Sequence, residues 1–384
     1  MADRSRGITV GFDAKRLTRN RTGLGNYSRF VADSLARFAP EVTQIHSASS
    51  LGNPELYAAL SDCPSFQLVT PKRSGMPFSD YVWRNYTSAK PLLESGIRLF
   101  HGLSNELPAS INRWGIPSLV TMHDLIYELF PEYYSPIDVR LYRHKYRRSC
   151  LDADRIVAVS ACTKRDLIRL YGIEEDKIEV VYQGCDPVFA QEIPHDCLEA
   201  VRRSYDLPPR FILSVGTIEE RKNTRLIVEA LPILEDKGIR LVLVGRETKY
   251  AEQVRRVAEK LHVSERLTIL SSVPFRDLPA IYRLAEVFVY PSLYEGFGIP
   301  ILESLNAGIP VVAATGSCLE EAGGPFSLYA DPHSPEDLAH RIESVSNLRG
   351  EMIVKGKEWA KQFRPEVLGP RLAGLYQQMI YPNK

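Results

Sequence analysis

Residues 290–310 read Tyr-Pro-Ser-Leu-Tyr-Glu-Gly-Phe-Gly-Ile-Pro-Ile-Leu-Glu-Ser-Leu-Asn-Ala-Gly-Ile-Pro and predict a turn between a strand and a helix. The β-branched and aromatic run at 286–290 favours a buried strand, which the next proline and serine end. A helix should begin near Pro300, because proline suits the first helical turn. It should end at Gly308, since glycine readily takes the left-handed conformation that closes a helix. The stretch therefore indicates one strand–turn–helix step of an α/β domain.

The turn itself has the residues of a binding site. Gly296 and Gly298 would let a ligand approach the backbone, and the N–H groups at a helix start attract an anion. Glu295 precedes the helix and Glu303 lies inside it, with seven residues between them. A carboxylate accepts two hydroxyl hydrogen bonds side by side, which suits a sugar or a ribose. The alternative is that Glu295 only favours the helix dipole and Glu303 is a solvated helix residue.

A second glycine-containing turn follows the predicted strand at 211–215. It begins at Gly216 and carries Arg221 and Lys222 immediately before Asn223, which can cap the next helix. Cations at a helix N-terminus oppose the helix dipole, so their presence is better explained if a polyanion binds there. A plain surface loop is the alternative.

The first half of the chain offers two further candidate positions. Gly23 and Gly25 lie between a predicted strand at 8–12 and a predicted amphipathic helix at 27–35, where open α/β sheets bind ligands. A tight turn capped by the following asparagine would explain the glycines equally well. The predicted strand at 118–124 has His123 at its carboxyl end, and this histidine is either ligand-facing or a satisfied structural residue.

Length and composition are those of a globular protein with two domains. The chain has 384 residues, which exceeds one typical core, and its net charge of +1 gives no global field that would favour nucleic acid. The six cysteines show no CxxC or metal-ligand spacing, so we expect reduced thiols. No apolar run approaches the roughly 20 residues of a membrane helix, and no signal-peptide core precedes the first strand. We therefore expect a cytoplasmic protein.

A basic stretch at 138–149 is the exception to this even charge distribution. Its cationic residues, which stand among apolar ones, are Arg140, Arg143, Lys145, Arg147 and Arg148. Such a helix can rest on anionic lipid or hold a phosphorylated acceptor. The first interpretation would place the protein peripherally at the inner face of the plasma membrane, in contact with anionic lipid. The alternative is a solvated helix face.

Several motifs in order resemble the retaining GT-B glycosyltransferases of family 4. They are Val-Gly-Thr-Ile-Glu-Glu-Arg-Lys-Asn at 215–223, Leu-Val-Gly at 243–245, the segment from Glu295 to Glu303, Ala-Gly-Ile-Pro at 307–310 and Leu-Tyr-Ala-Asp-Pro at 328–332. The resemblance implies two Rossmann-like, doubly wound α/β domains that face a cleft. The expected divisions are an acceptor domain at 1–186, a linker at 187–208, a nucleotide-sugar domain at 209–363 and a helix at 364–384 that packs back on the first domain.

The resemblance also implies roles for individual residues. The candidate catalytic residues are Lys222, which would neutralise a donor diphosphate, Glu295, which would hold sugar hydroxyls, and His123, which would face the reacting sugar. Asn105 and Asp124 are the candidates for acceptor binding. The further candidates for donor binding are Arg221, Thr217, Gly216, Glu303, Gly296, Phe297, Gly298, Ile299, Gly23, Gly25 and Val273.

One position departs from the family pattern. Many members have an arginine directly after the glycine of the turn at 216, where this chain has Thr217. Threonine brings no charge, so the second cation would come from Arg221 or Arg246. Glu303 would take the ribose hydroxyls. We expect no metal and no other cofactor, because side chains would supply the positive charge that a metal otherwise provides.

The motifs are most similar to those of mannosyltransferases of bacterial surface-polysaccharide and lipopolysaccharide assembly. The implied reaction moves mannose from GDP-mannose, with UDP-glucose and related donors as alternatives, to a growing, lipid-linked glycan. Retention would follow from front-face attack, in which the leaving phosphate takes the proton of the acceptor. The implied partners are the nucleotide sugar and the glycan, and not nucleic acid. Two other functions fit the residues: another GT-B enzyme, such as a sugar-nucleotide epimerase or a phosphorylase, and a non-catalytic nucleotide- or glycan-binding module.

Overall fold

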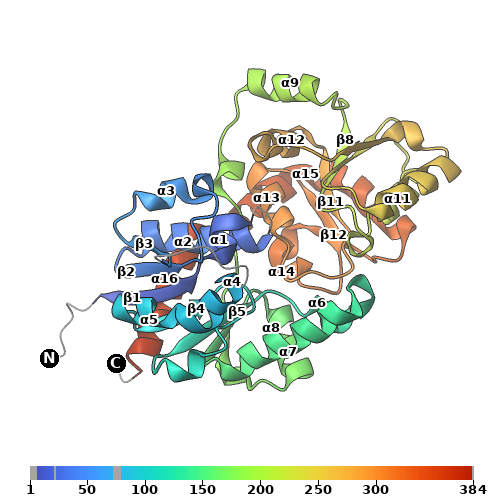
Figure 1. Ribbon diagram of the computed structural model, residues 1–384. Coiled ribbons are helices and arrows are strands. Elements are labelled where there is room, and N and C mark those ends of the chain that lie inside the picture. The colour runs from blue at the N-terminus through green and yellow to red at the C-terminus, as the bar shows by residue number, and fades with distance from the viewer. Residues whose placement is uncertain (1–6, 21–22, 72–78, 383–384) are drawn as a thin grey trace. The chain divides into compact units, whose positions relative to one another are not determined.

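The computed structural model describes residues 7–20, 23–71 and 79–382 and consists of two compact units (Figure 1). Unit 1 contains Met1–Gly184 and Phe363–Lys384, and unit 2 contains Cys185–Gln362. Each unit has one parallel sheet, of seven strands in unit 1 and six in unit 2. Helices cover both faces of each sheet, so the predicted fold of two doubly wound α/β domains is confirmed.

The sheet of unit 1 has the order β3-β2-β1-β4-β5-β6-β7. Its strands are β1 (Ile8–Asp13), β2 (Val42–Ser47), β3 (Phe66–Val69), β4 (Leu99–Gly102), β5 (Ser118–Met122), β6 (Arg155–Ala158) and β7 (Ile178–Val180). All neighbouring strands are parallel, so their carboxyl ends share one edge. The order reverses direction between β1 and β4, which is where doubly wound sheets bind ligands.

The helices of unit 1 include the last helix of the chain. They are α1 (Lys15–Arg19), α2 (Gly23–Phe38), α3 (Ala58–Ser61), α4 (Ser79–Val82), α5 (Ala89–Glu94), α6 (Ile126–Leu129), α7 (Pro136–Asp152), α8 (Ala161–Tyr171) and α16 (Pro365–Ile380). Helix α16 packs against α2, and Gly369 lies beside the backbone of Ser34. The Tyr376 hydroxyl lies 2.8 Å from His101 Nδ1, which ties α16 to β4.

The sheet of unit 2 has the order β10-β9-β8-β11-β12-β13 and reverses direction between β8 and β11. Its strands are β8 (Phe211–Val215), β9 (Arg240–Val244), β10 (Leu267–Leu270), β11 (Val287–Tyr290), β12 (Val311–Ala314) and β13 (Leu328–Ala330). Its helices are α9 (His195–Ser204), α10 (Thr224–Ala230), α11 (Lys249–Lys260), α12 (Leu278–Leu284), α13 (Ile299–Ala307), α14 (Leu319–Gly323) and α15 (Pro335–Ala360).

The predicted strand–turn–helix at 286–310 is confirmed as β11 followed by α13. Proline is at the second position of α13, and Gly308 closes it with φ of 77°. The prediction at Gly23 and Gly25 was wrong in one respect, because both glycines lie in the first turn of α2 and not in a loop before it. A Cβ on Gly25 would lie 2.0 Å from the Asn20 carbonyl oxygen, so packing alone explains this glycine.

The stretch predicted as a linker, 187–208, differs in structure from that expectation. It contains a 3₁₀ turn, Pro187–Ala190, and helix α9, and it belongs to unit 2. The Phe189 side chain is fully buried, the 3₁₀ turn contacts α13, and α9 contacts α12. Prolines and polar residues are typical of linkers, but the buried phenylalanine fixes this segment on the unit that follows.

No helix among the described residues is long and apolar enough to cross a membrane.

Gly245, directly after β9, is expected to tolerate no side chain. Its φ is 154°, and a Cβ there would lie 1.9 Å from the Gly216 carbonyl oxygen. We predict that Gly245→Ala lowers the free energy of unfolding by about 1–3 kcal/mol, as overpacking usually does. The matched control is Gly350→Ala inside α15, where nothing lies within 4 Å and alanine favours the helix. A melting temperature of Gly245→Ala equal to or above that of Gly350→Ala would contradict the close approach of Gly245 to the Gly216 carbonyl.

Candidate active site

In unit 2, the candidate residues lie in two loops at the point where the sheet reverses. The loop after β8 contains a 3₁₀ turn, Glu220–Lys222, and the loop after β11 contains Ser292 and Glu295. The loops meet at one backbone oxygen, because Leu293 N–H donates to the Arg221 carbonyl at 2.9 Å and Ser292 Oγ lies 3.1 Å from the same oxygen. The topology thus brings together residues that are about seventy positions apart in sequence.

Glu295 Oε1 contacts four side chains, three of them through hydrogen bonds and Arg221 through an ion pair. Lys222 Nζ lies 2.5 Å from it, Arg221 Nη1 2.8 Å, Ser292 Oγ 2.6 Å and the Tyr290 hydroxyl 3.2 Å. The side chains of the two cations are 14% exposed and that of Glu295 is 12% exposed. The structure therefore brings the predicted Lys222, Arg221 and Glu295 into direct contact.

The electrostatics of this cluster are set by partial burial and by mutual attraction. Burial would raise the pKa of Glu295, but Lys222 and Arg221 more than offset this and lower it to about 2. Burial lowers the pKa of Lys222, against the attraction of Glu295. Lys222 Nζ also donates to the Tyr290 hydroxyl at 2.5 Å and lies 5.0 Å from the centre of that ring. The cluster holds its charges in place only because each has a partner.

Of the two arginines considered as the second cation, Arg221 shares Glu295 with Lys222. Arg221 Nη2 donates to Glu219 at 2.6 Å and its Nη1 donates to the Tyr294 carbonyl at 2.6 Å. Arg246 is exposed and forms no ion pair with the residues that the structure describes. Thr217 is half-buried in the same loop. The Lys222 side chain passes 3.7 Å from the place of a Cβ on Gly216, which has φ of 148°.

The loop before α13 has a backbone that a ligand could approach. Gly298 has φ of 119° and precedes Ile299, the first residue of α13. Phe297 is buried, and Cys318 Sγ lies 3.0 Å from the Glu295 carbonyl oxygen and 3.2 Å from that of Phe297, so both oxygens are within reach of its single S–H. Gly296 is half-buried between them. The predicted glycines are thus in the turn, and a buried thiol fixes its carbonyls.

Glu303 lies one turn into α13 and has a partner that the sequence did not reveal. The Tyr282 hydroxyl donates to Glu303 Oε2 at 2.7 Å from helix α12. Burial raises the pKa of Glu303 to about 7, with Asp186 adding to the rise and Tyr282 opposing it. Glu303 therefore lies near the midpoint of its titration at neutral pH.

Val273 follows β10, the edge strand, and β9 separates that strand from β8. It is half-buried at the same carboxyl edge of the sheet.

In unit 1, His123 follows β5 and is 7% exposed. Its Nε2 lies 2.9 Å from the Leu103 carbonyl, which can only accept, so Nε2 carries the proton and Nδ1 presents a lone pair. Burial lowers the pKa of His123 to about 4, the hydrogen bond to Leu103 opposes this, and Arg16 lowers it further. The Tyr27 ring and the imidazole pack nearly perpendicular to each other, with ring centroids 4.6 Å apart. His123 is therefore a neutral hydrogen-bond acceptor at physiological pH.

The two acceptor candidates lie beside His123. Asn105 has φ of 63°, and its Oδ1 accepts the His123 backbone N–H at 2.8 Å. Asp124 is the next residue, and its Oδ1 accepts the Ile126 N–H at 3.1 Å. Gly23 is exposed in the first turn of α2, and no atom lies within 4 Å of the place that a Cβ would take there.

Sequence reasoning missed the tyrosines and the serine that hold the two glutamates. Tyr290 ends β11 and Ser292 follows it, so both were inside the stretch that predicted the turn. Tyr282 is fully buried on α12, where its hydroxyl needs a partner. A tyrosine at a strand end next to a lysine-bearing loop is a signal that could have found Tyr290. Nothing local in the sequence pairs Tyr282 with Glu303.

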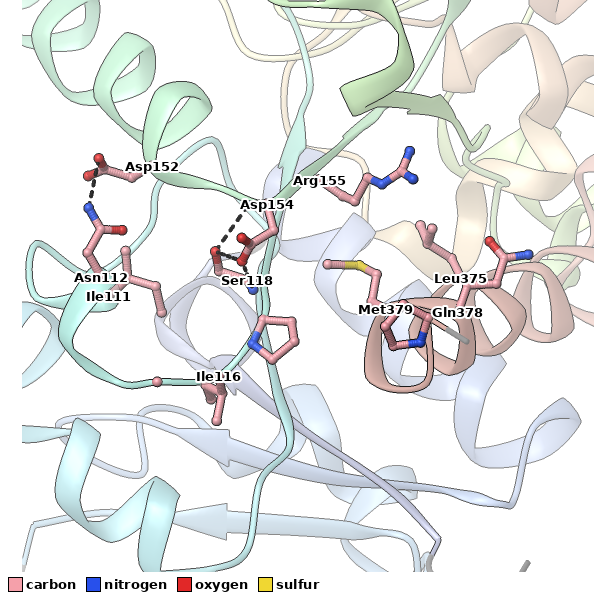
Figure 2. Close-up of a pocket in the computed structure, with 13 residues that line it drawn as sticks. Ile111, Asn112, Ile116, Ser118, Asp152, Asp154, Arg155, Leu375, Gln378 and Met379 are labelled. Atoms are coloured by element: carbon pink, nitrogen blue, oxygen red, sulfur yellow. Dashed lines mark hydrogen bonds between the residues drawn. The ribbon is translucent and has the colours of Figure 1, made fainter. Parts of the chain in front are cut away.

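A pocket of about 510 Å³ also lies in unit 1, beside α16 (Figure 2). Figure 2 shows Asp154 bonded to Ser118 and Asn112 bonded to Asp152 along its wall. Ser118 and Arg155 begin their strands, so this pocket is at the amino-terminal edge of the sheet. It contains none of the candidate site residues, which lie at the carboxyl edge. Across the described part of the chain, no group of three His, Cys, Asp or Glu residues could hold a metal ion.

Comparison with known proteins gives matches along both units. The description Glycosyltransferase Family 4 matches residues 21–189, and Glycosyl transferases group 1 matches residues 199–362. The chain is 29% identical over 369 residues to O-antigen chain mannosyltransferase B of Escherichia coli, which covers 89% of this chain and 92% of that protein. It is 24% identical to O-antigen chain mannosyltransferase RfbU of Salmonella typhimurium, over 87% of this chain and 90% of that one. A glycosyltransferase structure from Rickettsia africae matches with a TM-score of 0.76 at 19% identity, over 99% and 100% of the two chains.

The pKa of Glu303 predicts a pH-dependent gain of stability in Glu303→Gln. The folded-state pKa of about 7 exceeds the ordinary glutamate value, so the folded chain retains a proton that the unfolded chain loses between those values. Stability from this group is therefore greatest in acid and is lost as the pH rises toward 7. Glutamine imitates the protonated form at every pH. The melting temperature of Glu303→Gln should equal that of the wild type near pH 5 and exceed it near pH 8.

Glu295→Gln is the matched variant with the opposite sign. The pKa of Glu295 is lowered, so its stabilisation is present above the ordinary glutamate value and lost only in strong acid. Its melting temperature should lie below the wild-type value at both pH values, because two partly buried cations lose their carboxylate. Equal shifts of Glu303→Gln at both pH values would contradict the buried environment of Glu303.

Proposed function

We propose a mannosyltransferase function for this chain, which belongs to the GT-B glycosyltransferases of family 4 (group 1). The chain is a glycosyltransferase, and its relatives act in O-antigen synthesis by name. In the proposed reaction, mannose passes from GDP-mannose to a growing, lipid-linked glycan of a surface polysaccharide, with retention of the anomeric configuration.

The contact of Lys222 and Arg221 with Glu295 Oε1 is the observation that carries this proposal. Two partly buried cations at a sheet reversal suit the diphosphate of a nucleotide sugar. Negative charge grows on the diphosphate as the glycosidic bond breaks, so these cations would act mainly on the transition state. Arrival of the diphosphate would give Lys222 and Arg221 another anionic partner and release Glu295 toward the sugar hydroxyls.

Glu303 is proposed to bind the ribose of the donor nucleotide. Its carboxylate lies on the helix that follows the Glu295 loop, and Tyr282 occupies Oε2. Both oxygens of an ionised carboxylate can accept more than one hydrogen bond, so the Tyr282 contact leaves capacity for hydroxyls. Gly298, Phe297 and the first turn of α13 would lie against the phosphates, because helix N-termini attract anions.

His123 is proposed to accept a hydrogen bond from a hydroxyl of the reacting sugar through Nδ1. The support is the protonated Nε2, which the Leu103 carbonyl fixes, and the pKa near 4, which keeps the ring neutral. In the proposed front-face mechanism, the acceptor oxygen bonds to the anomeric carbon as the diphosphate leaves. The acceptor proton passes to the departing phosphate oxygen, so no side chain gains or loses a proton overall.

The proposed reaction needs no metal ion or other cofactor. Lys222 and Arg221 provide fixed positive charge where a divalent cation would otherwise neutralise the diphosphate. GDP-mannose is the proposed donor because the names of two relatives that align along most of the chain specify mannosyl transfer. The same names specify O-antigen chains, which supports a glycan as the acceptor.

The test is transfer of labelled mannose from GDP-mannose to membranes that carry the acceptor glycan, with EDTA present. We predict transfer by the wild-type chain and a decrease of about a hundredfold in Lys222→Ala, because one transition-state charge partner is lost. Lys260→Ala, at an exposed position of unit 2, is the control and should keep the wild-type rate. A near-normal rate in Lys222→Ala would contradict the diphosphate site. Transfer of glucose from UDP-glucose, with no transfer from GDP-mannose, would overturn the assignment of GDP-mannose as the donor.

We also propose that α7 rests on anionic lipid at the inner face of the membrane. Ile137 is 79% exposed, Leu141 42% and Leu151 56%, and Arg140 and Arg147 are exposed between them on the same helix face. Neither of these arginines forms an ion pair with a described residue, whereas Arg143 and Arg148 pair with Glu128 and Asp152. Exposed apolar residues that alternate with unpaired arginines suit the boundary between lipid headgroups and acyl chains.

Reversal of the two unpaired charges should weaken membrane binding. Arg140→Glu with Arg147→Glu should lower co-sedimentation with vesicles of anionic lipid by about tenfold or more, since each basic residue near the surface contributes about 1 kcal/mol. Arg256→Glu with Lys260→Glu makes the same change of net charge on α11 of unit 2 and serves as the control. If both double variants bind like the wild type, the exposed face of α7 is only solvated.

A further inference from the structure

Unit 1 has a cluster of charged side chains that the sequence did not reveal. It lies where the sheet reverses, between β1 and β4, as the Glu295 cluster lies between β8 and β11 in unit 2. Asp13 ends β1, Lys15 and Arg16 begin α1, and Glu106 follows β4. Arg84 comes from the helical turn Trp83–Thr87.

Two carboxylates hold Arg84 in place. Arg84 Nε lies 2.5 Å from Asp13 Oδ2, and its Nη2 lies 3.3 Å from Glu106 Oε2. Asp13 Oδ1 accepts the Lys15 backbone N–H at 2.9 Å. The side chains of Arg84, Asp13 and Glu106 are between 14% and 21% exposed. The guanidinium is therefore fixed and largely desolvated, which is the state in which arginine binds anions most strongly.

The other two cations of the cluster have no acidic partner. Lys15 and Arg16 are half-buried, and neither side chain has a carboxylate within 4.0 Å in the described parts of the chain. Burial lowers the pKa of Lys15, and repulsion from Arg84 and Arg16 lowers it further against the attraction of Asp13 and Glu106. Three cations thus face two carboxylates that already bind Arg84, and a further carboxylate that interacts with Lys15, Asp80, pairs with Arg19. These four cations and three carboxylates leave one positive charge in excess among the described residues at the ligand-binding edge of the sheet.

The charge of the cluster acts on His123. Arg16 lowers the pKa of His123, which follows β5, the neighbour of β4 in the sheet. We propose that Lys15, Arg16 and Arg84 form an anion-binding site that holds a phosphate group of the acceptor. The assignment to the acceptor rests on the proposed function, in which His123 faces the reacting sugar. The anion site itself rests only on the contacts and charges of unit 1.

A phosphate group fits these residues chemically. A bound phosphate would compensate the excess charge and relieve the repulsion between Lys15 and the two arginines. Arginine and lysine are the usual phosphate partners, the first through paired N–H groups and the second as a point charge. A phosphate or diphosphate that links a glycan to its lipid and the diphosphate of the donor share this chemistry, so the experiment has to separate them.

The first experiment measures binding of inorganic pyrophosphate to the full chain by calorimetry. The wild type should bind at one site in each unit, and Lys15→Gln with Arg16→Gln should lose the site in unit 1, with affinity there reduced by about tenfold or more. Lys90→Gln with Arg113→Gln, elsewhere in unit 1, is the control. An isotherm of the Lys15 and Arg16 variant that superposes on the wild type would overturn the proposal. Melting temperatures establish that the variants fold.

This readout separates the anion site from the proposed reaction. If Lys222 does not bind diphosphate, the wild type should bind pyrophosphate only in unit 1, and the double variant should bind none. The second experiment separates the two sources of phosphate by the KM values for transfer. The double variant should raise the KM for the lipid-linked acceptor by about tenfold and leave the KM for the donor unchanged. A rise in the donor KM instead would overturn the assignment to the acceptor.

Discussion

The contact of Glu295 with Lys222 and Arg221 is the interaction on which the organisation of unit 2 at its ligand edge depends. It joins the loops after β8 and β11, which are adjacent in the sheet but distant in sequence. Two partly buried cations side by side repel each other, so an anion has to lie between them. Ser292, Tyr290 and the buried thiol of Cys318 fix that anion and its loop. The site is therefore organised for negative charge before any ligand arrives.

The two units solve the same electrostatic problem differently. In unit 2, Lys222 and Arg221 are balanced by Glu295 and Glu219, so a diphosphate would compete with a carboxylate already in place. In unit 1, Asp13 and Glu106 both pair with Arg84 and also attract Lys15, while Arg16 has no carboxylate within 4.0 Å among the described residues. An anion there would add to the cluster and displace nothing. Binding of a diphosphate in unit 2 would thus involve an exchange of partners, whereas binding of an anion in unit 1 would complete a set of partners.

Local sequence signals predicted the elements well, and contacts between distant segments were predicted poorly. Pro300 and Gly308 mark the ends of α13, since each constrains the backbone at its own position. The role of Phe189 as an anchor could not be predicted, because its burial depends on packing against α12. The Tyr282 bond to Glu303 and the Arg84 bond to Asp13 depend on which helices lie beside which strands. Lys15 and Arg16 belong to no motif, so only the fold reveals that they lack partners.

The most direct test of the central claim is the structure of the full chain with the nucleoside diphosphate of its donor bound, which we propose to be GDP. We predict that the two phosphates lie against Lys222 Nζ and the Arg221 guanidinium, and that Glu295 Oε1 has moved out of contact with at least one of these cations. A diphosphate bound elsewhere, with the Glu295 contacts to Lys222 and Arg221 unchanged, would contradict it.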